Sequence, residues 1–452
     1  MFSSRKTAAP STGYNLTKSL RFRSSASAYL SRTPAGAGNQ TVWTWSKWVK
    51  RGTLGSIQTL FDAYTNGSNS SSISFTSADQ LQVSNYVSAS LVTNKVTTQV
   101  FRDPSAWYHI VVSSNGSTSL NIYVNGVQVT SFATNVGPTA ANWFFNGANN
   151  HRIGTEASGG SPTQLFDGYL TEVNFIDGQS LTPSSFGSTN ALTGVWQPAR
   201  YTGTYGTNGF YLPFTNTTST TTLGYDFSPN GNNWTTNNIS LTAGSTYDSM
   251  TDVPTLTSAT TANYCVLNPL DKASTVTNGN LTTSSGAAHQ SVRASFQAPS
   301  TGLYYMEATI LSTTAATVLA GLGLATASVA LTGSLASGSN IWFFYFGDQV
   351  YPNRNGTGSP FGGTTTAGTT IQLAIDMANS RAWVGLNNTW YDGSNGTTGN
   401  PSAGTNATFT SVASGVFPIL ETYSNTLNAN FGQQPFAYTP PSGFVALNTY
   451  NL

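Results

Sequence analysis

Charge and cysteine are both scarce in this sequence. Charged residues make up 7% of the 452 residues, whereas a typical soluble protein has about 25%. The formal net charge of +1 gives no electrostatic reason to expect binding to nucleic acid or to an anionic membrane surface. The only cysteine is Cys265, which excludes an intrachain disulfide, and we expect its thiol to be buried in a core.

Long apolar segments are also lacking. No run of about eighteen apolar residues occurs, so we expect no membrane-spanning helix and no membrane insertion. Residues 1–16 contain Arg5 and Lys6 but no apolar stretch, so we expect no secretory signal. Residues 1–18 are predicted to form an extended arm. Heptads and collagen repeats are absent as well, so the chain is not expected to build a long shaft.

Thr, Ser, Asn and Gly take the place of charge, together with 12% aromatic residues. That aromatic content argues against disorder. Residues 107–132 show the pattern that results. Three runs of alternating apolar residues are separated by Asn115-Gly116 and Asn125-Gly126, which supply the positive φ of tight hairpin turns. We predict a three-stranded antiparallel meander with Ile110 to Val129 placing their apolar side chains on one face.

A second hairpin is predicted at residues 371–391. The apolar residues from Ile371 to Met377 alternate with Gln372, Ala374 and Asp376, Asn379-Ser380 makes the break, and a second apolar run follows through Trp383. Two hairpins this far apart favour two all-β domains over one large domain.

Short strand patterns at roughly ten-residue spacing fill residues 19–190 and favour a β-sandwich. Three motifs stand out in chain order: Trp107-Tyr108-His109, the turn at 123–126, and Gly168 to Val173. Together they make this region resemble the laminin-G-like, concanavalin A-like jelly roll.

Residues 191–262 differ, being rich in Gly, Tyr and polar turn residues. A structureless loop of this length is improbable in a compact protein, so we predict an ordered connector whose aromatic residues pack onto one or both domains. With the C-terminal sequence PFAYTPPSGFVALNTYNL (435–452), this connector resembles those of bacteriophage tail-fibre and structural proteins.

Strand patterns resume in residues 263–452. The segments GLYYMEATI (302–310), GLGLA (321–325), the 371–391 hairpin and the final NFGQQPF (430–436) resemble a SPRY domain. The predicted fold is therefore all-β, with two concanavalin A-like jelly-roll β-sandwiches joined by an ordered, turn-rich connector.

Catalytic carboxylate pairs are hard to find. A retaining glycosidase needs two carboxyl groups about 5–5.5 Å apart, and no two acidic residues stand at i and i+2. The nearest clusters are Asp248 with Asp252, and Asp167, Glu172 and Asp177. We interpret Asp167 and Asp177 as turn caps before glycine and Glu172 as a solvated side chain. No catalytic residue is predicted.

Metal and nucleophile sites are not indicated either. His109, His151 and His289 show none of the spacings of metal or triad motifs, and we expect structural roles for them. Laminin-G-like domains often bind calcium at the rim, where Asp62, Asp79 or Asp103 could act as ligands. A turn role for these aspartates is favoured, so no metal or cofactor is assigned.

Aromatic and amide side chains in loops are the remaining candidates, because sugar and protein recognition combines flat apolar contact with hydrogen bonds. The predicted glycan- or partner-binding residues are Trp143, Phe145, Asn146 and Asn149 in the first domain and Tyr351, Asn353, Arg354, Trp390 and Tyr391 in the second.

The phage resemblance implies a non-enzymatic virion protein, a fibre or appendage subunit on the particle surface. It implies attachment to other virion proteins, a homotrimer, and lectin-like domains that recognise host cell-surface polysaccharide. The alternatives are a structural cement protein without a ligand, and a polysaccharide depolymerase.

Overall fold

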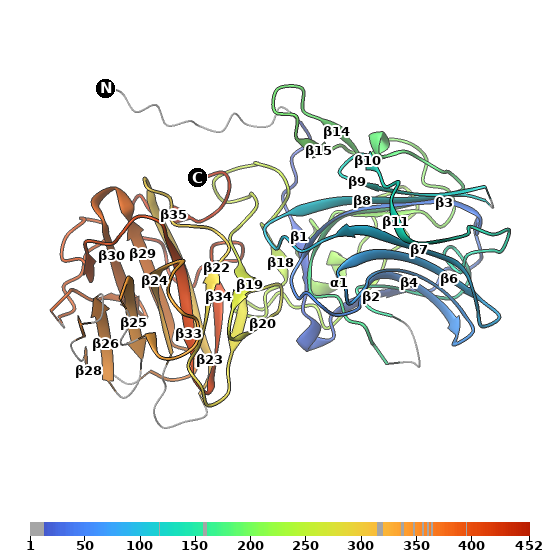
Figure 1. The fold of residues 1–452 in the computed structure, drawn as a ribbon. Helices are drawn as coiled ribbons and strands as arrows, with labels where there is room; N and C mark the ends of the chain where they lie inside the picture. The colour runs from blue at the N-terminus through green and yellow to red at the C-terminus, as the bar shows by residue number, and fades with distance from the viewer. Residues whose placement is uncertain are drawn as a thin grey trace. The chain divides into compact units, whose positions relative to one another are not determined.

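The computed structural model describes residues 13–116, 118–156, 161–313, 320–335, 339–346, 349–354, 357–358, 361–362, 365–394 and 396–452, with the backbone alone at 313, 320, 345–346 and 349–362. The chain forms two compact units (Figure 1). Unit 1 contains the described residues up to 242 and residues 247–257, and unit 2 contains residues 243–246 and the described residues from 258 onwards. Strands dominate both units, as predicted. The described helical segments are α1 (Thr220–Leu223) and the 3-10 turns η1 (Ser24–Ala26), η3 (Pro183–Ser185) and η5 (Met377–Asn379).

Unit 1 is a sandwich of two antiparallel sheets, whose strands lie in stacked layers in Figure 1. The first sheet has the order β10-β9-β8-β3-β13-β1-β18, with β16 also pairing with β13. Its strands are β1 (Ser19–Phe22), β3 (Val42–Arg51), β8 (Trp107–Asn115), β9 (Ser119–Val124), β10 (Val127–Gln128), β13 (Gly168–Asp177), β16 (Phe210–Leu212) and β18 (Ser249–Met250).

The second sheet of unit 1 has the order β11-β7-β6-β5-β4-β12-β2-β17. Its strands are β2 (Tyr29–Arg32), β4 (Gln58–Asn66), β5 (Asn69–Phe75), β6 (Gln80–Val87), β7 (Ser90–Val100), β11 (Phe132–Val136), β12 (Asn150–Ile153) and β17 (Thr235–Asn237). A short separate ribbon pairs β14 (Gly187–Thr189) with β15 (Trp196–Pro198).

The predicted meander is confirmed as β8, β9 and β10. Asn125 and Gly126 have φ values of 48° and 83°, and Val127 pairs with Val124 across this turn. Ile110, Val112 and Ile122 are fully buried. Val127 contradicts the predicted apolar face, because it is 71% exposed on the short edge strand β10. An edge strand of two residues has no facing sheet to cover its side chain.

Strands β3 and β13 are buried on both faces. Trp43, Trp45 and Val49 of β3 enter the core between the two sheets, and Ile176 of β13 joins a second cluster with Tyr205 and Tyr211 on the outer face. That outer cluster is made largely by residues 186–211. All ten residues of β13 are therefore buried, and no alternation of buried and exposed positions occurs along this strand.

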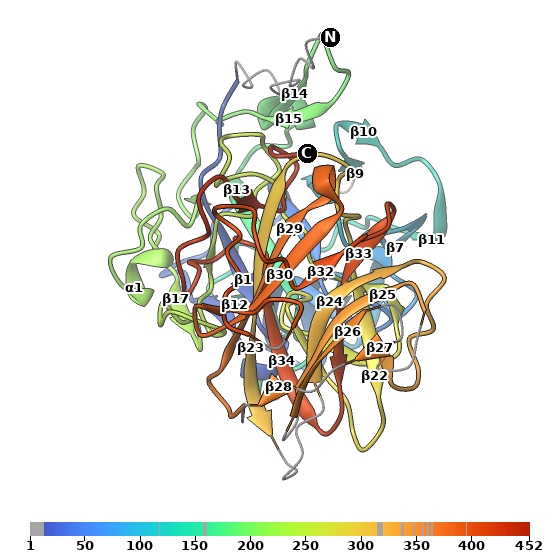
Figure 2. The ribbon, with the colours of Figure 1, turned by 90° about the vertical axis from the view of Figure 1, so that its left-hand side faces the viewer.

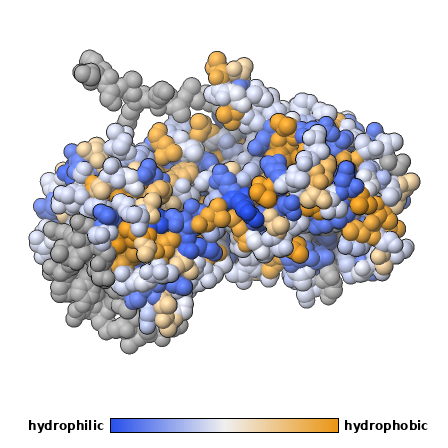
Figure 3. Space-filling view, viewed as in Figure 1, coloured by the Kyte–Doolittle hydropathy of each residue, from blue (hydrophilic) through white to orange (hydrophobic). Residues whose placement is uncertain are grey.

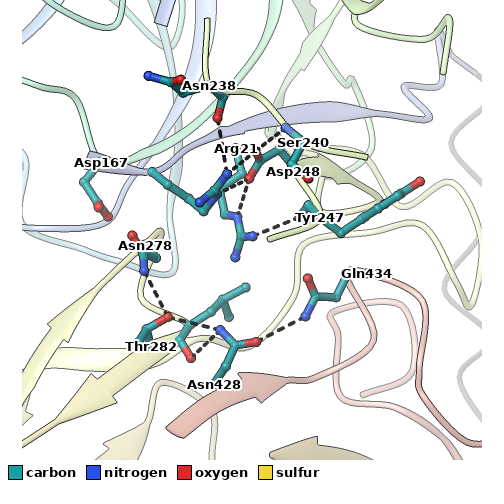
Figure 4. Close-up of polar contacts among 12 residues, drawn as sticks. Arg21, Asp167, Asn238, Ser240, Tyr247, Asp248, Asn278, Thr282, Asn428 and Gln434 are labelled. Atoms are coloured by element: carbon teal, nitrogen blue, oxygen red, sulfur yellow. Dashed lines mark hydrogen bonds and ion pairs between the residues drawn. The ribbon is translucent and has the colours of Figure 1, made fainter. Parts of the chain in front are cut away.

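Most of the predicted connector, residues 191–262, completes unit 1. β16 pairs with β13, β17 with β2, and β18 with β1. Charged contacts hold β18 in place, because Asp248 receives hydrogen bonds from Arg21 Nε (3.1 Å) and Arg23 Nε (2.8 Å) (Figure 4). Arg21 also donates to the Tyr247 carbonyl at 2.9 Å.

The start of the described chain lies along the same connector. The Leu16 amide donates to Thr255 Oγ1 at 3.2 Å, and Thr257 Oγ1 donates to the Leu16 carbonyl at 2.7 Å. Leu16 of the predicted arm is thus fixed to the chain's own connector, and residues 1–12 lie outside the described residues.

Unit 2 contains two further antiparallel sheets, apart from the parallel contact of β35 with β23. The first has the order β19-β22-β33-β24-β25-β26-β27, with β28 on β26. Its strands are β19 (Leu267–Lys272), β22 (Gln290–Ala294), β24 (Ala320–Thr326), β25 (Ile341–Phe346), β26 (Gln349–Arg354), β27 (Thr357–Gly358), β28 (Phe361–Gly362) and β33 (Val416–Thr422).

The second sheet of unit 2 has the order β20-β21-β34-β23-β29-β30-β31, with β32 on β30 (Figure 2). Its strands are β20 (Thr275–Thr277), β21 (Thr282–Ser284), β23 (Leu303–Thr313), β29 (Thr370–Asp376), β30 (Arg381–Leu386), β31 (Thr389–Trp390), β32 (Phe409–Thr410), β34 (Asn425–Asn430) and β35 (Val445–Ala446). Asn428 ties β34 to β21 by donating to Thr282 Oγ1 at 3.1 Å (Figure 4).

The second predicted hairpin is confirmed as β29 and β30. η5 and the left-handed Ser380 (φ 52°) make the break, and Leu373 lies opposite Val384. Cys265 is buried, as expected. Among the described residues no helix is long and apolar enough to cross a membrane. On the face drawn in Figure 3, apolar residues are scattered in patches between polar ones.

Candidate functional site

A groove in unit 2 is formed around Trp390, one of the predicted binding residues. The tight turn between β30 and β31 carries Asn387 and Asn388, whose φ values are 46° and 69°. Asparagine tolerates this left-handed conformation better than most residues. The turn places Trp390 opposite Gly385 on the neighbouring strand. A Cβ atom at Gly385 would lie 3.2 Å from the Trp390 ring, so the glycine leaves space for the indole.

An aromatic cluster lies behind Trp390. Trp390 packs against the cluster of Tyr305, Trp383 and Phe444, and its ring centroid lies 6.4 Å from that of Tyr305. The indole remains partly exposed. Its N–H donates no hydrogen bond to any residue that the structure describes and is not one of the buried, unpaired atoms. The Trp390 indole therefore offers a ligand both a flat apolar face and an N–H donor.

Two turn segments form the walls, residues 399–402 and 439–442, and together with Asn388 and Trp390 they enclose about 380 Å³. The Ser442 amide donates to Ser402 Oγ at 3.1 Å and joins the two walls. Prolines at 401, 440 and 441 stiffen them. The groove residues are Asn388, Trp390, Gly399, Asn400, Pro401, Ser402, Thr439, Pro440, Pro441 and Ser442, and none of them carries a charge.

Interactions behind the walls hold them in place. Glu307 accepts hydrogen bonds from the amides of Ala437 (2.8 Å) and Tyr438 (2.9 Å), which anchors the segment before the second wall. Trp383 Nε1 donates to the Thr405 carbonyl at 2.8 Å, beside the first wall. Burial raises the pKa of Glu307, against the lowering effect of the hydrogen bonds from Ala437, Tyr305 and Tyr438.

The other predicted residues of the second domain do not join this groove. The Tyr391 ring packs on Phe344 with centroids 5.6 Å apart, and burial raises the pKa of its hydroxyl. Tyr351, Asn353 and Arg354 were predicted in a loop, but their backbone forms strand β26 paired with β25. Their side chains lie outside the described residues.

The predicted loop site in the first domain is wrong. Trp143 and Phe145 are 1% and 0% exposed and pack around Trp43, with ring centroids 5.3 and 5.2 Å away. The loop that holds them folds into the core, because burying two large rings outweighs keeping them at the surface.

The two asparagines of that loop are not displayed at the surface either. Asn146 is buried and donates to the Asn39 carbonyl (3.0 Å) and to Asp177 (2.6 Å). The backbone carbonyl oxygen of the half-buried Asn149 lies 2.7 Å from His151 Nδ1, whereas its side-chain Nδ2 is buried and donates no hydrogen bond to any residue that the structure describes.

The three histidines have structural contacts. His109 is buried between Trp48 and Trp196 and receives a hydrogen bond from Trp196 Nε1 at 3.0 Å. Burial and the charge of Lys47 lower its pKa to about 3. Burial lowers the pKa of His151 to about 4. His289 Nδ1 lies 2.8 Å from Glu421 Oε1.

The aspartates considered for calcium do not converge. Asp79 receives hydrogen bonds from Arg51 Nη1 (2.8 Å) and Arg102 Nε (2.9 Å). Burial alone would raise the pKa of Asp79, but these contacts and the hydrogen bond from the Gly55 amide lower it below its ordinary value. Asp62 is buried, and Asp103 accepts from the Ser105 amide in a turn. No group of three or more metal-ligating side chains occurs within the described residues.

Glu172 corrects another expectation. It was interpreted as a solvated side chain, yet it is only 5% exposed. Asp177 does have a turn role, since it accepts hydrogen bonds from the amides of Asn39 (2.8 Å) and Asn208 (3.0 Å). Sequence reasoning also missed the two walls of the Trp390 groove, although the Pro440-Pro441 pair is a signal for a stiff turn.

Comparison with known proteins agrees with this architecture. Residues 24–185, within unit 1, match a laminin-G-type family model described as the concanavalin A-like lectin/glucanases superfamily. No curated protein matches the sequence.

Solved structures show weak similarity. Domains LG4-5 of the mouse laminin alpha1 chain share 9% identity, with 98% of this chain and 96% of that chain covered and a TM-score of 0.31. The SPRY domain of human HERC1 shares 15% identity over 38% of this chain and 99% of its own, with a TM-score of 0.30. Domain 4 of the arabinanase AbnA from Geobacillus stearothermophilus, solved with arabinotriose, shares 20% identity over 33% of this chain and 65% of its own, with a TM-score of 0.23. By the family-model match and not by these structures, residues 24–185 form a β-sandwich of the concanavalin A-like, laminin-G type.

Proposed function

We propose that this protein is a non-enzymatic carbohydrate-binding subunit of a bacteriophage virion, and that the Trp390 groove binds host cell-surface polysaccharide. The groove carries the proposal. It combines a partly exposed indole, packed from behind by buried aromatic residues, with uncharged amide and hydroxyl groups on its walls. The apolar face of a sugar ring stacks on an aromatic side chain, while hydroxyl groups exchange hydrogen bonds with amides and serines.

The open shape of the groove suits a segment of a long polymer. Its walls enclose about 380 Å³, near the lower end of the roughly 300–1,000 Å³ typical of small-molecule sites. Because the lining is uncharged, we expect a neutral stretch of polysaccharide to be preferred here.

The virion role rests on the phage-like connector and C-terminal sequence. On this proposal the protein is part of a tail fibre or a surface appendage, assembles as a homotrimer, and attaches to other virion proteins. Its mass in solution, measured by light scattering, should be three times that of the 47.6 kDa chain. A monomeric mass would contradict the proposed trimer and leave the binding proposal standing.

Binding is tested with the labelled protein on an array of purified bacterial capsular polysaccharides and lipopolysaccharides. We expect saturable binding that the free polysaccharide competes away. Trp390→Ala should weaken binding at least tenfold, because a central aromatic contact contributes about 2 kcal/mol or more. Tyr86→Ala is the matched control, since Tyr86 is an aromatic residue of unit 1 that is 38% exposed.

Three outcomes would contradict the proposal. Absence of binding by a folded protein would favour a structural cement protein. If Trp390→Ala and Tyr86→Ala weakened polysaccharide binding equally, the groove would not be the binding site. Release of reducing sugar from a bound polysaccharide would favour a depolymerase.

A further inference from the structure

A second pocket lies in unit 1, around an unusual position in strand β13. The pairing of β13 with β3 shifts register between Thr171 and Asn174. Inside this bulge Glu172 has a φ of 54°, a left-handed conformation that is uncommon for a residue other than glycine. β-Bulges re-aim side chains and are frequent beside binding sites, and strained residues gather there as well.

The bulge directs the Glu172 carboxyl group toward two tyrosines. Tyr211 of β16 donates to Glu172 Oε1 at 2.6 Å, and Tyr14 lies 3.3 Å from the same oxygen. The two hydroxyl groups are themselves 2.7 Å apart. Oε2 accepts no hydrogen bond from a described residue, and it is not among the fully buried, unpaired atoms. One carboxyl oxygen is therefore available to a ligand.

The pocket beside this carboxyl group is small and carries two cations. It encloses about 170 Å³, well below the roughly 300–1,000 Å³ of sites for drug-sized ligands, so it admits one small group. Neither Lys18 nor Arg200 forms an ion pair with a carboxylate in the described part of the chain. The Arg200 guanidinium lies 4.5 Å from the Tyr211 ring centroid.

An aromatic side chain completes the lining. Phe227 is 41% exposed and is part of the pocket wall, so its ring offers a flat apolar surface next to the two cations. The chemically informative residues are Tyr14, Lys18, Glu172, Arg200, Tyr211 and Phe227.

We propose that this pocket binds the carboxylate of a single acidic sugar residue, of the hexuronate class. Arg200 and Lys18 supply the positive charge and the donors that a carboxylate needs. Phe227 packs against the sugar ring, and protonated Glu172 donates its hydrogen to the ligand. This site is separate from the Trp390 groove, so its test and the test of polysaccharide binding can fail independently.

Binding at this pocket should depend on pH. Burial raises the pKa of Glu172 to about 7, although Tyr211, Tyr14 and Arg200 act in the lowering direction. Below that pH Glu172 is a neutral donor, and above it a carboxylate that repels the ligand. The charged and titratable groups around it are Tyr14, Lys18, Tyr205, Tyr211 and Arg200. Burial raises the pKa values of all three tyrosines above 10 and lowers the pKa of Lys18 from 10.5. Among these groups, Glu172 is the one whose pKa lies between pH 6 and 8.

The experiment is isothermal titration of the full chain with glucuronate, with glucose, acetate and inorganic phosphate as comparison probes. We expect saturable binding of glucuronate that weakens roughly tenfold between pH 6 and 8. Glucuronate stays ionised over this range, because sugar-acid carboxyl groups titrate well below pH 6. Glucose should not bind, and acetate and phosphate should bind more weakly because they lack the ring.

Two variants and a control identify the pocket. Arg200→Gln should weaken glucuronate binding about tenfold or more. Glu172→Gln should bind at pH 8 as tightly as at pH 6. Lys272→Met removes an exposed lysine of unit 2 and should change nothing. Arg200 is at the surface, so its variant should fold, which the far-UV circular dichroism spectrum checks.

Several results would overturn the proposal. If glucose and glucuronate bound with equal affinity, the pocket would not recognise the carboxylate. Equal binding of acetate, phosphate and glucuronate would make this a general anion site. Equal affinities of the Arg200→Gln and Lys272→Met variants, or pH dependence that persists in Glu172→Gln, would place the binding elsewhere.

Discussion

Glu172 should make the stability of unit 1 decrease as the pH rises. Glu172 is only 5% exposed, and burial raises the pKa of its carboxyl group from 4.5 to about 7. The folded state therefore holds a proton that the unfolded chain releases. Stability from this group is fully present below pH 4.5 and is lost as the pH rises through 7. The difference between pKa values of 4.5 and about 7 corresponds to roughly 3 kcal/mol of unfolding free energy.

The Glu172→Gln variant isolates this contribution. Glutamine keeps the shape of the side chain and cannot ionise. The difference in unfolding free energy between the variant and the wild type should therefore change by about 3 kcal/mol in favour of the variant between pH 4.5 and pH 8.5. Urea unfolding followed by tryptophan fluorescence at a series of pH values measures this difference, and all other titrating groups cancel in it. A difference that stays constant from pH 4.5 to 8.5 would refute the assignment of a neutral, buried carboxyl group. A difference of opposite slope would mean that Glu172 is stabilised as the anion.

The remaining predictions concern other sites. Lys47 is fully buried, with its Nζ 3.3 Å from the Trp45 ring centroid, and burial lowers its pKa well below 10.5. Its contribution to unfolding free energy should therefore rise with pH up to 10.5, and Lys47→Met should remove that slope in the same urea assay; an unchanged slope would contradict this. Gly126→Ala should destabilise unit 1 by about 1 kcal/mol or more in thermal unfolding, because φ is 83° there and a Cβ would lie 2.5 Å from the Trp196 ring; Gly116→Ala, where the space is open, is the control that should cost less. Trp390→Ala should weaken polysaccharide binding while Tyr86→Ala does not, as measured on the array. Glucuronate binding should be lost in Arg200→Gln and kept in Lys272→Met.

The strands and turns could be predicted from the sequence because their signals are local. Alternating apolar residues and Asn-Gly pairs place β8, β9 and β10 within a few residues of their observed bounds. Ser380 and Asn379 mark the break between β29 and β30 in the same way. Each of these signals depends on residues that are adjacent in sequence.

The sites were harder to predict because they depend on residues far apart in the chain. Trp143 has the composition of a binding loop, and only the position of Trp43, a hundred residues earlier, makes it a core residue. Glu172 lies in a regular-looking strand pattern, and nothing local announces a bulge with Tyr14 and Tyr211 beside it. Trp390 was identified from its own segment, but the wall at 439–442 comes from the end of the chain.

The strands contributed by residues 235–250 have a consequence for solubility and for the choice of an expressible fragment. β17 covers the free edge of β2, and β18 covers the free edge of β1. An uncovered edge strand presents a row of unpaired amide and carbonyl groups on which another chain can add. A fragment that ends near residue 190 keeps the whole laminin-G-like pattern but leaves both edges open, together with the outer face of β13. The smallest soluble form of unit 1 should therefore extend to residue 257.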